Sequence, residues 1–222
     1  VNKSIAGLYS PGSTFKPLVA LAALEFGTID PERPILCKGH KHPYELYGVK
    51  YHCWKKSGHG YMKLRNAIKQ SCDIYFYEMA RLLGVDRLAI IAKRYGLGSN
   101  ILKDLYFEEK KGVVPNTFWK KNAIGKSWYL GETVINGIGQ GYIQTTPLQL
   151  CLMTAQIANG GYKIKPHIIQ DESITYENVK LKIANQFINS PLNFSEEDDQ
   201  KYLVDREYRL YERLYKDPRN IN

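Results

Sequence analysis

Apolar side chains recur at the 3.6-residue spacing of a helix in several segments of this chain. Between positions 13 and 26, Phe15, Leu18 and Ala22 share one helical face, and Gly27 is a natural stop. The same criteria predict further helices at 62–70, 73–83, 86–95 and 147–158, and a charged helix at 195–215. Residues 162–169 alternate as a strand does. These patterns alone indicate an α+β fold rich in helices.

Two segments interrupt the helical pattern. Residues 28–61 are rich in Gly, His, Lys, Pro and Tyr without a sustained period, which predicts a long loop or small hairpins. Ser71 and Cys72 form a break between two predicted helices. With 222 residues, the chain has the length of one domain or one and a half.

Composition is that of a globular protein, with 44% hydrophobic and 24% charged residues. The longest apolar run, Leu18–Leu24, ends at Glu25 and is far too short to cross a bilayer. The chain opens on Val1 without a signal peptide, so we expect a piece of a longer protein whose targeting segment, if it has one, lies upstream.

The net charge of +9 adds little to this picture. Lysine and arginine residues are scattered in ones and twos among acidic residues, which argues against a nucleic-acid partner. A solvated basic surface is the plainer interpretation, although such a surface also suits anionic cell-wall polymer or lipid headgroups.

The stretch "YSPGSTFKP" places a serine and a lysine three positions apart where the first predicted helix begins. A hydroxyl is a poor nucleophile until a neighbouring base takes its proton. Lys16 follows Ser13 by one helical turn and can act as that base if burial keeps it uncharged. The free amides of the helix N-terminus stabilise negative charge near Ser13. An isolated Ser-x-x-Lys is also compatible with an N-cap serine and a solvated lysine.

A second motif, Ser71-Cys72-Asp73, lies at the predicted break, 58 residues after Ser13. Ser71 can relay a proton between the lysine and a leaving amine. Asp73 can orient a substrate amide or hold Lys16 through a charge-assisted hydrogen bond. The alternative is an interhelical cap, in which Ser71 and Asp73 bond orphan backbone amides.

Together, the stretches "SPGSTFKP", "SCDIYFYEMARLLG" and "GETVINGIGQGYIQTTPLQL" resemble the transpeptidase domain of class B penicillin-binding proteins. The Ser-x-Asp form and the intervening "WKKSGHG" resemble the elongation-specific type, penicillin-binding protein 2. The resemblance covers about residues 5–170. It implies a helix-rich serine acyltransferase fold (penicillin-binding/β-lactamase-like), α+β in class, with an incomplete antiparallel sheet. Residues 1–222 would then be a partial transpeptidase domain, with a helical subdomain at about 13–160 and a C-terminal helix at 195–215.

By this resemblance, Ser13 is the acylated nucleophile, Lys16 its general base, Ser71 the proton relay, and Asp73 the third position of the second motif. The implied D,D-transpeptidase reaction begins when the serine attacks the D-alanyl-D-alanine carbonyl of a peptidoglycan stem peptide. The terminal D-alanine leaves, and a neighbouring peptide's amine takes the acyl group to form a crosslink. β-Lactams mimic the dipeptide and trap the acyl-enzyme. Catalysis of this kind needs no cofactor.

The resemblance also implies a place in the cell. The full-length protein would act in peptidoglycan synthesis and cell shape at the periplasmic face of the bacterial inner membrane. Its partners would include a membrane glycosyltransferase and proteins of the elongation machinery.

One family feature is missing from the sequence. The third motif, Lys-Ser/Thr-Gly on an edge strand, should follow "GIGQGY", but no such tripeptide occurs after Tyr142. Lys56-Ser57-Gly58 matches it and lies on the wrong side of Ser71. In the family that strand supplies the carboxylate-binding group and half of the oxyanion hole. We therefore expect this chain alone to have little or no transpeptidase activity, because one lost oxyanion donor costs a factor of about 10²–10³ in rate.

Three of the four cysteines, Cys37, Cys53 and Cys72, flank or enter the same region, with His59 among them. Three thiolates and one imidazole complete a tetrahedral structural zinc site, which would pin the long loop onto the break that carries Ser71. The spacings of 16, 6 and 13 residues match no standard finger. A Cys37–Cys53 disulfide and unpaired thiols therefore stay open as alternatives.

Three other histidines also bear on this site, and the fourth cysteine has a separate interpretation. His40, His42 and His52 compete with His59 as the nitrogen ligand. Cys151 is expected in the core, on the apolar side of its helix.

Three functions are therefore compatible with the sequence. The first is a fragment of a peptidoglycan D,D-transpeptidase that β-lactams bind. The second keeps the acylation chemistry in a β-lactamase or penicillin sensor. The third is a non-catalytic or split-gene fragment that acts as a binding or assembly module, which the missing third motif favours.

Overall fold

The computed structural model describes residues 2–102 and 108–166. The chain divides into two units, 1–159 and 160–222, and all elements reported below belong to the first. The α-helices of the described residues are α1 (Lys3–Ala6), α2 (Lys16–Glu25), α3 (Leu64–Lys69), α4 (Asp73–Leu83), α5 (Val85–Arg94), α6 (Thr117–Ile124), α7 (Leu130–Asn136) and α8 (Pro147–Ala158). The 3₁₀ turns are η1 (Gly12–Phe15) and η2 (Gly39–Lys41). The strands are β1 (Ile35–Cys37), β2 (Tyr44–Leu46), β3 (Val49–Tyr51) and β4 (Gly60–Met62).

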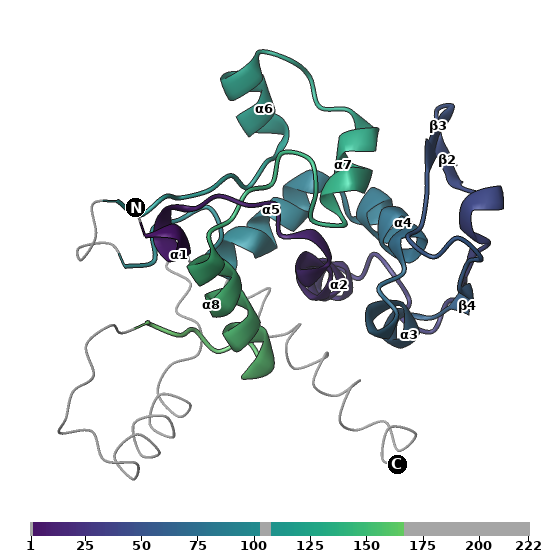
Figure 1. The fold of residues 1–222 in the computed structure, drawn as a ribbon, viewed down its shortest axis with the longest axis horizontal. Coiled ribbons are helices and arrows are strands. Elements are labelled where there is room, and N and C mark those ends of the chain that lie inside the picture. The colour runs from purple at the N-terminus through teal and green to yellow at the C-terminus, as the bar shows by residue number, and fades with distance from the viewer. Residues whose placement is uncertain (1, 103–107, 167–222) are drawn as a thin grey trace, which may run out of the picture. The chain divides into compact units, whose positions relative to one another are not determined.

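Helix α2 is the central helix of this unit. Its sequence, KPLVALAALE, is apolar on nearly every side, which is typical of a helix surrounded by protein. It packs against α4 and α5, and Figure 1 shows the three helices next to one another. Phe15, Leu18 and Val19 are fully buried at this contact. The packing places Lys16, the first residue of α2, inside the protein.

The segment between α2 and α3, predicted as a long loop or small hairpins, forms two small antiparallel sheets, of which β2–β3 is a hairpin. Strand β1 pairs with β4, so that Cys37 lies opposite Gly60. Strands β2 and β3 form a hairpin whose two turn residues, Tyr47 and Gly48, have φ angles of 49° and 78°. Positive φ at both positions is the geometry of a type I′ turn, which fits the natural twist of a hairpin.

Most helices predicted from the spacing are present. Helices α4 and α8 have the bounds expected at 73–83 and 147–158. Helix α8 begins with a capping box, in which the Thr146 and Gln149 side chains each bond the other's backbone N–H. The predicted 62–70 helix is shorter because its first residue pairs in β4. The helix-rich α+β class is thereby confirmed.

Other predictions differ from the structure or fall outside it. Residues 162–166 form no strand, and the rest of the strand predicted at 162–169 lies outside the described residues, as does the helix predicted at 195–215. The core position predicted for Cys151 is wrong, because this side chain is exposed. The buried stripe of α8 follows Gln149, Leu152, Met153 and Gln156, and Cys151 lies outside it. In the part of the chain that the structure describes, no helix has both the length and the apolar character that a bilayer crossing needs.

Candidate active site

Ser13 lies in the turn η1, immediately before the buried helix α2. Gly12, with φ of 57°, lets the chain turn sharply there, and its N–H donates to the Gly139 carbonyl at 2.8 Å. The Ser13 side chain is exposed, whereas Lys16 one turn later is buried. The local sequence therefore presents a hydroxyl to solvent at the head of a helix whose first lysine points inward.

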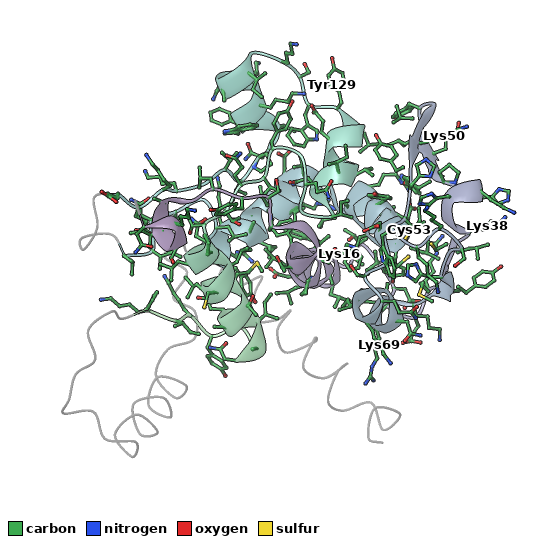
Figure 2. The ribbon with its side chains drawn as sticks, viewed as in Figure 1. Lys16, Lys38, Lys50, Cys53, Lys69 and Tyr129 are labelled. Atoms are coloured by element: carbon green, nitrogen blue, oxygen red, sulfur yellow. The ribbon has the colours of Figure 1, made fainter. Side chains whose placement is uncertain are left out.

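The Lys16 side chain is only 2% exposed and is fully hydrogen-bonded. Its Nζ donates to Ser71 Oγ at 2.9 Å, to the Ser71 carbonyl at 3.0 Å and to Asp73 Oδ1 at 2.6 Å. The ring of Phe76 lies 5.5 Å from the same nitrogen. A buried amine is tolerated here because a carboxylate and two oxygens of the facing turn satisfy it. Figure 2 shows Lys16 on α2.

Ser71 occupies the break between α3 and α4 and has φ of 52°, a left-handed conformation that is uncommon for residues other than glycine. This conformation directs both its carbonyl and its hydroxyl toward Lys16. The Ser71 hydroxyl also donates to Ser13 Oγ at 3.0 Å. A hydrogen-bonded path thus runs from the exposed Ser13, through Ser71, to the buried amine. Strained backbone of this kind is concentrated at functional sites.

Asp73 is the first residue of α4, where the helix dipole stabilises a carboxylate. Its two oxygens have different partners. Oδ1 accepts from Lys16, and Oδ2 accepts from the backbone N–H of Trp54 at 2.9 Å. The four residues singled out from the sequence, Ser13, Lys16, Ser71 and Asp73, therefore meet in one network.

A pocket of about 560 Å³ opens over this network. It is lined by Ser13, His52, Cys53, Trp54, Ser71, Asp73, Tyr77, Ile138 and Gln140. Burial raises the pKa of Tyr77, so its hydroxyl stays protonated and donates to the His52 carbonyl at 3.2 Å. Sequence reasoning did not single out three of these lining residues, Trp54, Tyr77 and Gln140. The repeated glycines around Gln140 and the tryptophan after Cys53 were the available signals.

The cysteine and histidine residues singled out from the sequence also meet. The ligand atoms of Cys37, Cys53, His59 and Cys72 all lie within 4.8 Å of one another, and the three cysteines are buried. His59 Nδ1 faces the sulfurs of Cys37 and Cys53 at 3.5 and 3.4 Å. Three sulfurs and one nitrogen at these separations suit a tetrahedral zinc ion. Figure 2 shows Cys53 on the side of the unit that carries the short strands.

The thiols in this cluster differ in acidity. Hydrogen bonding with Cys72 lowers the pKa of Cys53, and the same interaction raises the pKa of Cys72. A thiolate is the form that binds a metal ion. All four cysteines of the chain, including the exposed Cys151, are free thiols in the structure.

Comparison with known proteins places this geometry in context. The family model for the penicillin binding protein transpeptidase domain matches residues 1–198 of this chain. The peptidoglycan D,D-transpeptidase MrdA of Acinetobacter baumannii is 38% identical over 170 residues, which are 76% of this chain and 25% of that protein. The chain spans about a quarter of the length of the curated relatives it matches.

Solved structures agree with this match. PBP2 of Pseudomonas aeruginosa, solved in complex with WCK 5153, superposes with a TM-score of 0.72 at 44% identity, over 77% of this chain and 38% of that one. PBP2 of Helicobacter pylori, solved in complex with MreC, superposes with a TM-score of 0.68 at 30% identity, over 84% of this chain and 35% of that one.

Proposed function

This chain belongs to the penicillin-binding protein transpeptidase family, and on that premise we propose that it carries the serine acylation site of a peptidoglycan D,D-transpeptidase. The observation that carries the proposal is the hydrogen-bonded path from Ser13 through Ser71, both of which line the pocket, to the buried Lys16. Ser13 is the nucleophile, Lys16 the general base, Ser71 the relay, and Asp73 holds the lysine in place.

In the proposed acylation, Lys16 acts in its uncharged form, whose two N–H groups bond Asp73 and the Ser71 carbonyl while its lone pair faces Ser71 Oγ. Ser13 donates its proton to Ser71 as its oxygen attacks the carbonyl carbon of the substrate, and Ser71 passes its own proton to Lys16. Hydroxyl hydrogens rotate freely, so the same two oxygens can carry the proton in either direction. When the C–N bond breaks, the proton returns along this path to the departing amine. The product is an ester between Ser13 and the acyl group.

The substrate is inferred from the family. In a peptidoglycan stem peptide the broken bond would join the last two D-alanines, and a neighbouring peptide's amine would then attack the ester to form a crosslink. β-Lactams would acylate the same oxygen. The names of the matched relatives, peptidoglycan D,D-transpeptidases, support this assignment.

Cellular context belongs to the same proposal. We infer that the full-length protein works at the periplasmic face of the inner membrane, with a membrane glycosyltransferase and other elongation proteins. The complex of the Helicobacter pylori PBP2 with MreC supports a partner of this kind.

A fluorophosphonate probe tests the acylation site directly. Its phosphorus bonds to an activated serine oxygen while fluoride leaves, and the serine proton passes to the general base. We expect one adduct on Ser13 by intact mass and peptide mapping. Ser13→Ala should abolish it, and Ser57→Ala, which alters the Lys56-Ser57-Gly58 match, should leave it unchanged.

The lysine is tested with Lys16→Gln, because glutamine keeps a donor for Asp73 but cannot take a proton at neutral pH. A variant without any donor would leave Asp73 Oδ1 without a hydrogen bond, which costs about 1–3 kcal/mol. Labelling of Lys16→Gln should fall by a factor of about 10² or more while the thermal midpoint shows that it folds. Labelling at the wild-type rate would contradict the proposed base.

We further propose that Cys37, Cys53, His59 and Cys72 bind a structural zinc ion. Their mutual distances and their burial support this, and the ion would tie the segment around β1 and β4 to the Ser71 turn. A bound metal would stabilise the fold, since the unfolded chain has no such site. Purified protein should contain one zinc per chain. Cys72→Ser should lower both zinc content and thermal midpoint, whereas Cys151→Ser, outside the cluster, should change neither. Unchanged zinc in Cys72→Ser would exclude that ligand.

A further inference from the structure

Trp54 combines an exposed ring with buried hydrogen bonding. Its side chain is 62% exposed, yet both of its N–H groups donate to the segment from Gln70 to Asp73. An indole that only packed against other side chains would be buried. An indole at the surface without a structural role would leave its N–H to water. The position therefore needs another explanation.

The first of these donors acts on Asp73. The backbone N–H of Trp54 occupies Oδ2 at 2.9 Å, which leaves Oδ1 to face Lys16 at 2.6 Å. A carboxylate held by two partners on its two oxygens cannot rotate away from either of them. The bond from Trp54 thereby sets the direction of the Asp73 oxygen that meets the lysine.

The second donor acts on Ser71. Trp54 Nε1 lies 3.0 Å from the Ser71 carbonyl oxygen and 3.2 Å from the Gln70 carbonyl oxygen. Lys16 Nζ bonds the same Ser71 oxygen at 3.0 Å. The indole thus holds the left-handed turn in place from outside, while the lysine holds it from inside.

These two contacts act on the groups that hold Lys16. Its Nζ donates to Asp73 Oδ1 and to the Ser71 carbonyl, and the two N–H groups of Trp54 donate to the same carboxylate and the same carbonyl. The Ser71 hydroxyl, which lies between Ser13 and Lys16, belongs to this turn. We propose that Trp54 is a positioning residue that fixes the Asp73–Ser71 turn and with it the Ser71 hydroxyl, a role that rests on the proposed acylation of Ser13.

The surroundings of Trp54 fit this role. It directly follows Cys53, which is 1% exposed, so its backbone N–H comes from a fixed segment. Its ring meets the edge of His59 with centroids 5.3 Å apart. Trp54 therefore joins the Cys/His cluster to the proton path from Ser13 to Lys16. It also lines the pocket beside Ser13.

The test is the rate of fluorophosphonate labelling at Ser13 in the full chain, measured against probe concentration. Trp54→Phe keeps an aromatic ring and removes the indole donor. We expect the maximal labelling rate to fall about fivefold, the effect of one hydrogen bond. The fall should appear in the maximal rate, because the indole bond fixes the relay hydroxyl and does not bind the probe.

Trp128→Phe is the matched control, because it removes an indole donor that bonds Thr133 Oγ1 at 2.7 Å outside the pocket lining. Its labelling kinetics should match the wild type. If Trp54→Phe does not fold by circular dichroism, benzothienylalanine at position 54 keeps the bicyclic shape and lacks the N–H. An unchanged maximal rate, whether or not the probe concentration of half-maximal rate changes, would overturn the role of Trp54. No adduct on Ser13 in the wild type would overturn the proposed function itself, and this inference with it.

Discussion

Lys16 is the residue whose surroundings most constrain the chemistry of this site. Its amine is buried and has three oxygen partners on the facing turn, at 2.6–3.0 Å. Ser71 provides two of these oxygens, and the start of α4 provides the third through Asp73. Because all three oxygens come from one short turn, the Lys16 amine and the Ser71 hydroxyl are held against each other, as the proposed proton transfer requires.

Gly139 offers a test of how precisely Ser13 must be placed. A Cβ at this position would collide with the backbone of Gly12, which precedes Ser13, and its φ of 72° disfavours any side chain. We expect Gly139→Ala to destabilise the fold and to slow labelling of Ser13 about tenfold or more, because displaced reacting groups lose rate steeply. Labelling kinetics and a thermal melt measure the two effects.

Gly141→Ala separates backbone strain from displacement. Its φ of 81° carries a similar left-handed cost of about 1–2 kcal/mol, but the nearest neighbour of its Cβ is Ile135 at 3.4 Å. This variant should lose stability and keep most of its labelling rate. Equal labelling by the two variants would show that Gly139 does not position Ser13.

At the scale of elements, α4 organises the site and its surroundings. Its first residue is Asp73, and five residues further along, Glu78 accepts a 2.7 Å hydrogen bond from Tyr44 of β2. Arg81 donates to both oxygens of the same carboxylate, at 2.7 and 2.8 Å. The helix that carries part of the active site thereby also anchors the β2–β3 hairpin.

The Glu78 link makes the fold sensitive to acid. Burial raises the pKa of Glu78, but the bonds from Arg81 and Tyr44 outweigh it and hold the pKa below its ordinary value. Because folding lowers this pKa, ionised Glu78 contributes its full stabilisation above its unfolded-state pKa, near 4.3. That stabilisation is lost as the pH falls through the lower pKa of Glu78 in the folded protein. The thermal midpoint of the wild type should therefore fall more between pH 6 and pH 3 than that of Glu78→Gln. Parallel curves for the two proteins would remove Glu78 from the acid response.

At the scale of the whole molecule, the pocket is assembled from four distant parts of the chain. Ser13, Trp54, Ser71 and Gln140 come from separate segments and line one cavity. The Gly12–Gly139 hydrogen bond joins the first of these segments to the last. The site therefore depends on the packing of the entire first unit.

The sequence leads to a prediction for the molecule's reaction with penicillin. No Lys-Ser/Thr-Gly follows Tyr142 in these 222 residues, and the family resemblance implies that an oxyanion donor comes from the strand that carries this motif. We expect acylation of this chain alone by a labelled penicillin to be slower by a factor of about 10²–10³ than in a complete family member. Intact mass against time measures the rate. Rapid, stoichiometric and stable acylation would refute the prediction, whereas fluorophosphonate labelling without it would agree with an incomplete site.

Some helices and residues could not be predicted from the sequence, for physical reasons. Helix α6, TFWKKNAI, has no apolar stripe to reveal it, and α7 is short and contains Gly131. Trp54 carries no local sign of its two inward donors, because they bond residues 16 to 19 positions further along the chain. The α+β class and the bounds of α4 and α8 were predictable, because caps and apolar spacing are properties of neighbouring residues.

By itself, the sequence determined the main helices, the turn before Ser13 and the serine–lysine spacing of one turn, since each of these depends on residues a few positions apart. Only the tertiary structure decided that the Ser71 turn meets Lys16, that three cysteines and His59 converge, and that the Trp54 indole bonds the Ser71 carbonyl. Contacts between distant segments follow from how the whole core packs, and no local pattern encodes them.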